Sequence, residues 1–416
     1  MMSGSYGANR PQKRKIDESQ DDHRNNWRRN DRHSSDKRKC ISHPSDSEEC
    51  FAVHPRNKYN GSAPSLRKPM FVGDFCLDEN RLFCHDKRNL HFIKVDWRDS
   101  KKVDFDLNVA MDKMIKKDFQ ETRKEKLDRL LEWILHDKFK FHTRESEGKP
   151  LQCLSTDFVC FRGLLTELLC TPYESREGWI ICATKYRGTI YLCAYETPEK
   201  LAHRENETEV QKKMCSWGYK FEHFMTEDVD VNEGVNENEE YCCVVRSRLD
   251  NHSLVYGAEV DGADPEKYKS PHSDLSAFVE LKTSKELNTD RDMRSLHRFK
   301  LMKWWSQSYL VGIPRVVAGF RDMDGHVNTL KTYHVNEMPH IAQDHWQDNI
   351  MLNFLNQFLS FVKRNVQKDD PKTVYKFERQ KQGGDIYCTY LGEDPAWTFL
   401  PKWYYEKIFQ TEDNTP

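Results

Sequence analysis

The sequence predicts a mixed α/β fold, in which one folded domain follows a polar N-terminal tail. Strand-like segments alternate irregularly with amphipathic helical segments, which favours a mixed fold over a doubly wound parallel sheet. Hydrophobic residues make up 37% of the 416 residues and charged residues 32%, against about 45–50% and about 25% in average globular chains. Part of the chain therefore does not contribute to a hydrophobic core.

Residues 1–65 account for this low hydrophobic content. No leucine occurs before Leu66, and the segment is rich in Arg, Lys, Asp, Ser, Asn and Pro. Such a segment cannot bury enough apolar surface to offset its chain entropy. We therefore expect residues 1–65 to be a disordered basic and polar tail, and residues 66–416 to form a single domain. The basic runs at 13–15 and 37–39 are typical either of a nuclear localisation signal or of a solvated tail.

The cysteines and the hydropathy indicate an intracellular protein. The 13 cysteines are scattered and contain no CxxC pair, which is typical of free thiols in a reducing compartment. No apolar stretch approaches the roughly 18–20 residues that span a bilayer, and the N-terminus lacks the apolar segment of a signal peptide. We expect a nuclear protein, with the cytoplasm also open, and no membrane partner.

Three amphipathic helices are predicted from apolar residues spaced three and four apart. The first covers about 118–138. The second covers about 291–311, and Gly312 with Pro314 supplies its end. The third covers about 344–366.

Short β-rich segments bounded by turn residues lie between and after these helices. Asp324-Gly325 is typical of a hairpin turn, and Gly383-Gly384 marks a second hairpin near the C-terminus. The predicted strands are 189–193, 255–261, 278–282, 315–320 and 329–335.

Glu259-Val260-Asp261 is the first group of residues that indicates chemistry. On a strand, residues i and i+2 point to the same face, so Glu259 and Asp261 are expected side by side. Adjacent carboxylates repel each other. A divalent cation such as Mg²⁺ or Mn²⁺ removes this conflict, because it prefers hard oxygen ligands. The alternative is a solvated strand face or a cross-strand ion pair.

Glu280-Leu281-Lys282 repeats this spacing on the next predicted strand. Glu280 can join the metal site, and Lys282 can hold a phosphate oxygen or the attacking water. Each motif alone is more typical of an ordinary strand face, but together they indicate a metal-dependent phosphodiester hydrolase. The arrangement resembles the core of restriction-endonuclease-like nucleases, which implies a mixed two-sheet α/β core with flanking helices.

Three further residues suit a phosphate-bearing substrate. Arg162 precedes an apolar stretch, and its planar guanidinium fits a phosphate; the alternative is a structural salt bridge. Gln307 can reach a phosphate or a base edge, whereas its neighbours Trp304 and Trp305 are more typical of a core. Glu222 adds an acid after an aromatic and basic run.

Six motifs, in order along about residues 70–408, resemble those of the decapping exoribonuclease family. The motifs are Phe161-Arg162-Gly163, Gly218-Tyr219-Lys220-Phe221-Glu222, Glu259-Val260-Asp261, Glu280-Leu281-Lys282-Thr283-Ser284-Lys285, Lys303-Trp304-Trp305-Ser306-Gln307-Ser308 and Gly319-Phe320-Arg321. The resemblance implies that residues 66–416 are a catalytic domain that removes incomplete or unmethylated caps, NAD caps or triphosphates from RNA five-prime ends. It also implies 5′-3′ exoribonuclease activity and RNA quality control.

The resemblance further implies roles for individual residues. The backbone carbonyl of Leu281 would join the four acids in holding one or two Mg²⁺ or Mn²⁺ ions, with two the expected number, for two-metal hydrolysis. Lys282 and Gln307 would contact the scissile phosphate and the nucleophilic water. Arg162 would hold an RNA phosphate, with Phe161 and Gly163 lining the same wall. Further substrate contacts would be Arg81, Glu125 and Cys242.

Two other readings stay open. The chain could be a non-catalytic nuclear adaptor of the same fold, although all four acids and Lys282 are present, which favours an enzyme. It could also be a nuclease that acts on DNA, because the catalytic core does not choose the sugar. A nuclear five-prime exonuclease is a candidate partner, since the family includes the protein that partners the yeast nuclear enzyme.

Overall fold

The computed structural model describes residues 49–98, 100–141, 154–227, 230–269 and 274–409, which belong to one compact unit. The expected tail therefore lies outside the described residues as far as residue 48. For residues 49–65 the expectation of disorder is wrong. The strand β1 (Glu49–Phe51) pairs with β15 (Ile386–Gly392), and Val53 and Tyr59 are buried. A sheet edge provides hydrogen bonds and an apolar surface that the local composition does not reveal.

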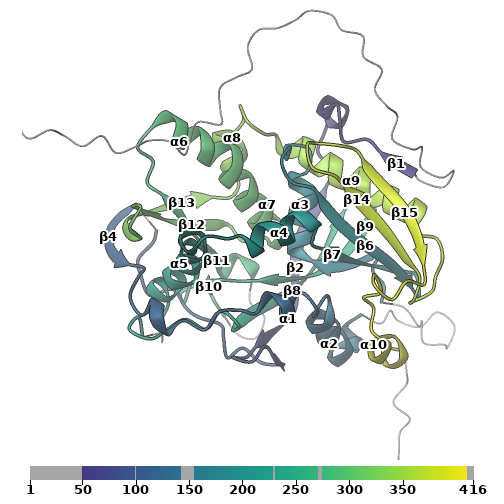
Figure 1. Cartoon of the computed structure of the whole chain (residues 1–416), viewed down its shortest axis with the longest axis horizontal. Coiled ribbons are helices and arrows are strands. Elements are labelled where there is room, and N and C mark those ends of the chain that lie inside the picture. Colours follow the sequence, from purple (N-terminus) through teal and green to yellow (C-terminus); the bar gives the residue numbers. More distant parts are fainter. Residues whose placement is uncertain (1–48, 99, 142–153, 228–229, 270–273, 410–416) are drawn as a thin grey trace, which may run out of the picture. The chain divides into compact units, whose positions relative to one another are not determined.

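The fold is built on two mixed sheets, as predicted (Figure 1). The larger has the order β1-β15-β14-β6-β7-β5-β9-β8-β2-β3, and the smaller has the order β10-β11-β12-β13-β4. Most pairings are antiparallel, but β5 runs parallel to β7 and β9, and β11 runs parallel to β12. The remaining strands are β2 (Leu66–Leu77), β3 (Phe83–Cys84), β4 (Lys101–Asp106), β5 (Phe158–Phe161), β6 (Trp179–Tyr186), β7 (Thr189–Tyr195), β8 (Glu240–Leu249), β9 (His252–Glu259), β10 (Gly262–Ala263), β11 (Phe278–Lys285), β12 (Arg315–Arg321), β13 (His326–His334) and β14 (Val374–Arg379).

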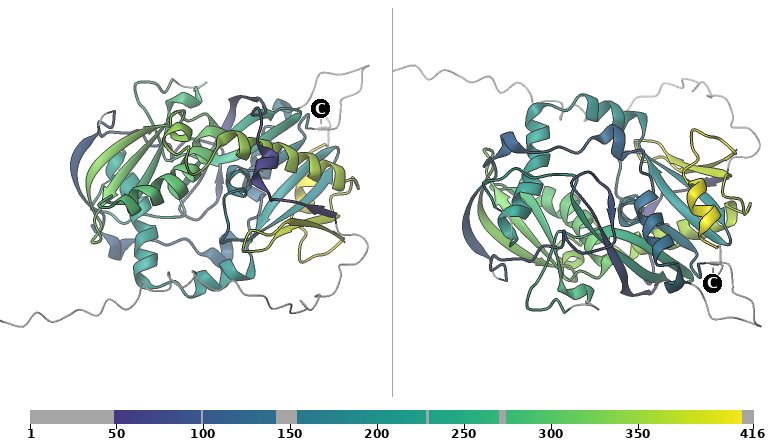
Figure 2. Two further views of the ribbon diagram at one scale, coloured as in Figure 1. Left: turned by 90° about the horizontal axis from the view of Figure 1, so that it is seen from above. Right: turned by 90° about the horizontal axis from the view of Figure 1, so that it is seen from below.

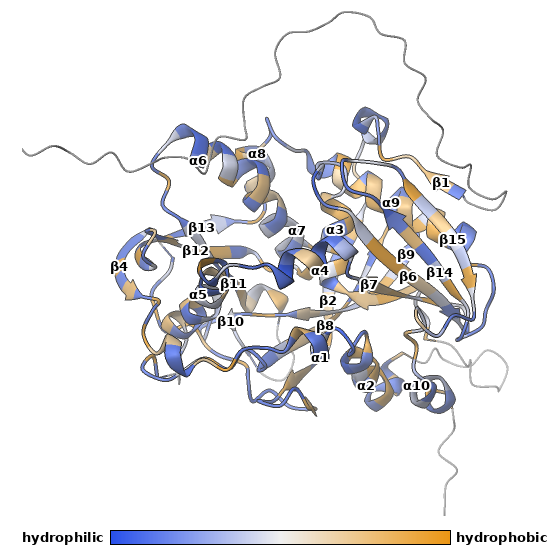
Figure 3. Cartoon of the chain, viewed as in Figure 1, coloured by the Kyte–Doolittle hydropathy of each residue, from blue (hydrophilic) through white to orange (hydrophobic). Residues whose placement is uncertain are grey.

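Helices flank both sheets and complete the core. The strands of the larger sheet are largely hydrophobic, whereas α6 is mostly hydrophilic (Figure 3). After β7 the chain leaves the larger sheet through α4 and α5, and α5 packs against β11 of the smaller sheet; Figure 2 shows this segment bridging the two sheets. The helices are α1 (Phe119–Thr122), α2 (Asp128–His136), α3 (Arg162–Cys170), α4 (Pro198–Glu205), α5 (Glu209–Met225), α6 (Asp290–Ser295), α7 (Met302–Val311), α8 (Met338–Ile341), α9 (Asp348–Asn365) and α10 (Lys402–Lys407).

The predicted strands and hairpins all occur, with boundaries that differ by a few residues. The predicted helix 291–311 is one helical stretch that contains a π-helical segment, Leu296–Leu301, between α6 and α7, and Gly312 ends it in a left-handed conformation. The predicted helix 118–138 is interrupted, because Lys126 adopts φ +49° between α1 and α2. None of the described helices is long and apolar enough to cross a membrane.

Candidate active site

The two sheets meet where β9 of the larger sheet leads into β10 of the smaller one. Glu259 is the last residue of β9, Asp261 lies in the link, and Gly262 of β10 pairs with Val279 of β11. The prediction that Glu259 and Asp261 share one strand face is therefore wrong, since the strand ends between them. The crossing still brings both acids to β11, which carries Glu280.

Asp261, Glu280, Lys282 and Arg162 form a compact charged cluster. The main-chain N–H of Leu281 donates to Asp261 Oδ2 over 2.7 Å. Lys282 Nζ lies 3.2 Å from the same oxygen and 2.7 Å from Glu280 Oε1. Arg162 Nη1 donates to Glu280 Oε2 over 3.2 Å. Glu280 is fully buried and Arg162 is 8% exposed, so two cations and two acids share a space with little access to water.

The remaining acids carry uncompensated charge. Burial raises the pKa of Glu259 to about 7, and the carboxylates of Glu240 and Asp261 act in the same direction. The Glu259 side chain does reach solvent, but protein surrounds it on most sides. Burial also raises the pKa of Glu222 well above its usual value, with Asp261 and Glu259 adding to the effect.

Glu280 differs from the other acids because its two cations dominate. Burial opposes its ionisation, but Lys282 and Arg162 outweigh burial and lower its pKa. Burial raises the pKa of Asp261 in spite of Lys282. Repulsion among Glu222, Glu259 and Asp261 thus remains in the absence of a further cation.

Glu222 reaches the cluster from α5. A capping box fixes the start of this helix: Thr208 accepts from the Gln211 N–H, and Gln211 accepts from the Thr208 N–H. Phe221, which precedes Glu222, is fully buried against Gly319 of β12. A Cβ atom on Gly319 would lie 2.5 Å from Phe221 Cε2, so the absence of a side chain there lets α5 approach the sheet.

The substitution Gly319→Ala is expected to destabilise the domain by about 1–3 kcal/mol, the usual cost of overpacking a core. It should also weaken metal-dependent function, because a displaced Phe221 moves Glu222. Gly218→Ala on the same helix is the matched control: its Cβ meets nothing within 4 Å, so stability should stay equal or rise. Denaturant unfolding of both variants measures this difference, and equal midpoints would contradict the proposed contact.

The predicted phosphate contacts other than Lys282 lie on α3 and α7. Phe161 is the N-cap of α3, and Arg162 and Gly163 begin the helix. Gly163 and Gln307 of α7 line one cavity of about 370 Å³ that follows α3 as far as Thr171. The structure therefore places Gln307 on the Gly163 side of α3, and Arg162 turns toward Glu280.

The other predicted substrate contacts lie on or beside β8. Cys242 of β8 pairs with Glu259 of β9 and is buried, and burial raises the pKa of its thiol. Arg81 adopts φ +60°, which is uncommon for a residue other than glycine. Its guanidinium donates two hydrogen bonds to the carboxylate of Glu125, over 2.8 and 2.9 Å.

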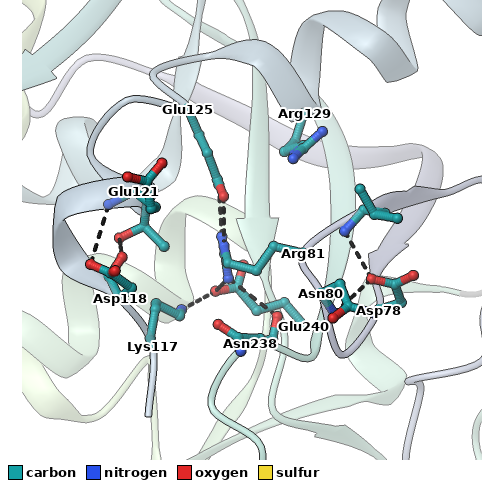
Figure 4. Close-up of polar contacts among 12 residues, drawn as sticks. Asp78, Asn80, Arg81, Lys117, Asp118, Glu121, Glu125, Arg129, Asn238 and Glu240 are labelled. Atoms are coloured by element: carbon teal, nitrogen blue, oxygen red, sulfur yellow. Dashed lines mark hydrogen bonds and ion pairs between the residues drawn. The ribbon is translucent and has the colours of Figure 1, made fainter. Parts of the chain in front are cut away.

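Glu240 and Lys117 are site residues that the sequence analysis missed. Glu240 accepts from Arg81 Nη1 over 2.9 Å and forms an ion pair with Lys117 (Figure 4). Lys117 also lowers the pKa of Glu259 by charge attraction. Glu240 begins β8, two residues before Cys242, and this same-face spacing on a strand-like run is the signal that could have identified it.

The donor set of the cluster fits a divalent cation. Its members are carboxylates, the hard ligands that Mg²⁺ and Mn²⁺ prefer, and the buried Glu280 Oε1 accepts no well-directed hydrogen bond. Within the described part of the chain, no three His, Cys, Asp or Glu side chains already stand in a metal-binding arrangement. Instead, Lys282 Nζ lies between Asp261 and Glu280, so binding requires small side-chain movements.

Comparisons with known proteins agree with this architecture. Residues 67–405 match the family described as RAI1 like PD-(D/E)XK nuclease. The chain is 38% identical over 366 residues to the decapping and exoribonuclease protein of Bos taurus, which covers 86% of this chain and 89% of the relative.

Two solved structures share the fold. Rai1 of Scheffersomyces stipitis in complex with (3′-NADP)+ and calcium ion has a TM-score of 0.73 at 19% identity, covering 86% of this chain and 99% of that one. Rai1 of Candida albicans in complex with pU5-Mn2+ has a TM-score of 0.70 at 17% identity, covering 87% and 98%. The prediction of a restriction-type nuclease core is confirmed. With a family match over most of its length and a curated relative at this identity, the chain belongs to the RAI1-like PD-(D/E)XK nuclease family and is a hydrolase of that family.

Proposed function

We propose that this chain is a divalent-metal-dependent hydrolase of RNA five-prime ends. The main support for this function is the cluster of Glu222, Glu259, Asp261 and Glu280 with Lys282 at the junction of the two sheets. It lies in a chain that shares 38% identity with a decapping and exoribonuclease protein over most of both lengths. A chain that had lost catalysis would have no reason to keep this repulsive arrangement of acids.

The acids and the Leu281 carbonyl would hold the metal, and two ions are proposed because the acids lie on both sheets. A bound divalent cation supplies Lewis acidity that activates water and stabilises developing phosphate charge. Lys282 is placed to move from Asp261 and Glu280 onto the scissile phosphate. Gln307, at the cavity along α3, and Arg162, which turns toward Glu280, would orient the substrate.

The proposed substrates are RNAs with a free, NAD-linked, triphosphorylated or incompletely capped five-prime end. Support comes from the two fungal relatives, one of which binds (3′-NADP)+ and the other pU5 with Mn²⁺. We also propose 5′-3′ exoribonuclease activity, on the basis of the decapping and exoribonuclease relative. A nuclear location and binding to a nuclear five-prime exonuclease are further proposals, which rest on the basic runs of the tail and on the family alone.

A panel of RNAs that differ only at the five-prime end tests this function. With Mn²⁺ present, release of NAD, a cap dinucleotide or pyrophosphate is expected from at least one RNA, with products identified by mass. A DNA strand of the same sequence is expected to react more slowly, and EDTA is expected to stop all reactions. Equal turnover of DNA and RNA would favour the DNA nuclease reading, and no turnover of any member with Mg²⁺ or Mn²⁺ would favour a binding adaptor.

A further inference from the structure

A second polar pocket of about 500 Å³ lies beside the acid cluster, between α1, α4 and the end of β7. Cationic side chains dominate its lining, and two aromatic rings interleave with them. The lining residues that carry the argument are Lys117, Phe119, Arg123, Lys126, Tyr195 and Arg204. Basic groups interleaved with exposed rings suit a nucleotide, because the cations bind phosphate and the rings stack on bases.

Lys126 is the most informative residue of this pocket. Its ammonium lies 3.6 Å from the centre of the Tyr195 ring, and the side chain is half-buried. Within the described parts of the chain, no carboxylate lies within ion-pair distance of Lys126 Nζ. A desolvated cation without an acid is costly unless a ligand supplies the anion. Its backbone also adopts the left-handed φ of +49°, a strained conformation that persists only where the surrounding structure enforces it.

The remaining lining groups extend a platform on which a base can stack. Arg204 lies over the Phe119 ring at 4.2 Å, and Phe119 is 49% exposed. Arg204 pairs over 3.1 Å with Glu196, which is the one acid among the described residues that line the pocket. Arg123 is exposed at the rim. The pocket therefore keeps an excess of positive charge.

Lys117 links the pocket to the acid cluster. Lys117 lines the pocket, forms an ion pair with Glu240 (Figure 4) and attracts Glu259. A strand whose scissile phosphate lies at Glu259 can thus continue along Lys117 into the pocket.

We infer that the pocket around Lys126 is a subsite for a substrate phosphate other than the one undergoing hydrolysis. This inference rests on the proposed function, because it takes the ligand to be a nucleic-acid strand. The phosphate has two possible sources, the five-prime-terminal group or an internal phosphodiester. Lys126 and Arg123 would bind it, and the Phe119 ring would stack on the adjoining base.

The test compares Lys126→Met with the wild type in binding a fluorescent ten-nucleotide RNA. Methionine keeps an apolar stem on Tyr195 and removes the charge. Binding is measured in EDTA, where metal-dependent cleavage does not take place. We expect a five- to tenfold weaker affinity, and a plot of log affinity against log salt whose slope is smaller by roughly 0.7, the value for one phosphate contact on a single strand. A folding defect alone would not change this slope.

The matched control is Lys124→Gln. It removes the same charge two residues away, at an exposed lysine that pairs with Glu121 and does not line this pocket; affinity and slope should not change. RNAs with a five-prime phosphate and with a five-prime hydroxyl separate the two sources. A slope change on both RNAs assigns an internal phosphate, and a change only on the phosphorylated RNA assigns the terminal one.

Other outcomes would overturn the subsite. One is an unchanged slope on both RNAs. The other is an acidic peptide whose binding requires Lys126 when the binding of RNA does not, and this result would assign the pocket to a protein partner. The fate of the proposed function is separate. If the substitution Lys126→Met changes the salt slope of RNA binding but the wild type cleaves no RNA with metal, the subsite stands and the proposed function fails. If the wild type cleaves RNA and Lys126 has no effect, only the subsite fails.

Discussion

The double substitution Glu259→Ala with Asp261→Ala is expected to abolish RNA hydrolysis, with a fall in rate of more than about 10³-fold. Glu259 ends β9 and Asp261 lies in the link through which the larger sheet passes into the smaller one, so their removal leaves only Glu222 and Glu280 of the four acids. RNA binding should persist in part, since Arg162, Lys117 and the pocket around Lys126 keep their charge. The rate is measured as the product released from RNA with Mn²⁺.

A control of equal composition is Glu337→Ala with Asp344→Ala, two exposed acids near α8. This variant should hydrolyse RNA at the wild-type rate. If the Glu259 and Asp261 variant still released NAD or a cap dinucleotide at a comparable rate, the assignment of the active site to the sheet junction would be wrong. Loss of RNA binding together with activity would instead indicate a folding defect. A lowered unfolding midpoint would identify such a defect.

The position of Asp261 shows what strand periodicity can predict and where it stops. The i, i+2 rule predicted that Glu259 and Asp261 lie close together, and the structure does bring them close, but for a different reason. The chain leaves β9 after Glu259, and Asp261 is held by the Leu281 N–H and Lys282 of the other sheet. A sequence pattern does not reveal where the chain leaves one sheet for another. The end of the strand depends on pairing with residues about 20 positions later.

The break in the predicted helix 118–138 has a tertiary cause. The apolar spacing correctly located α2, whose buried face includes Leu130, Leu131 and Ile134. The left-handed Lys126 ends the helical path before it, and its contact with the Tyr195 ring lies far away in sequence. Helical spacing predicts which face of a helix is buried. It does not predict that one residue is held out of the helix by a ring that is distant in sequence.

The placement of Glu222 shows a signal that was available. Its motif was identified, but no element was assigned to it. Thr208 followed three residues later by Gln211 is a capping box that predicts the start of α5, and this start places Glu222 near the C-terminal end of the helix. The contact of Phe221 with Gly319 was not predictable, since it requires knowledge of which sheet α5 covers.

Two single substitutions in the acid cluster should change stability in opposite directions, although both reduce activity. In the metal-free protein, Glu280→Gln is expected to lower the free energy of unfolding by about 3 kcal/mol, the range for removing one partner of a buried ion pair. Arg162, 8% exposed, would lose the carboxylate to which its Nη1 donates. Glu222→Gln is expected to raise the free energy of unfolding by about 1 kcal/mol, because a neutral amide replaces a carboxyl group whose ionisation burial, Asp261 and Glu259 all oppose.

The sign of each change in stability depends on whether a cationic side chain lies next to the acid. Lys282 and Arg162 lie on Glu280, whereas among the described residues no cation lies within ion-pair distance of Glu222. Denaturant unfolding in EDTA measures both variants. Added Mn²⁺ should stabilise the wild type more than Glu222→Gln, since the stabilisation by a ligand of the native state rises with its affinity, logarithmically. A destabilised Glu222→Gln variant in EDTA would mean that Glu222 has a structural partner and that the repulsion among the acids does not dominate the metal-free site. A Glu280→Gln variant as stable as the wild type would mean that Lys282 and Arg162 do not depend on this carboxylate, and the cluster would then be organised around Asp261.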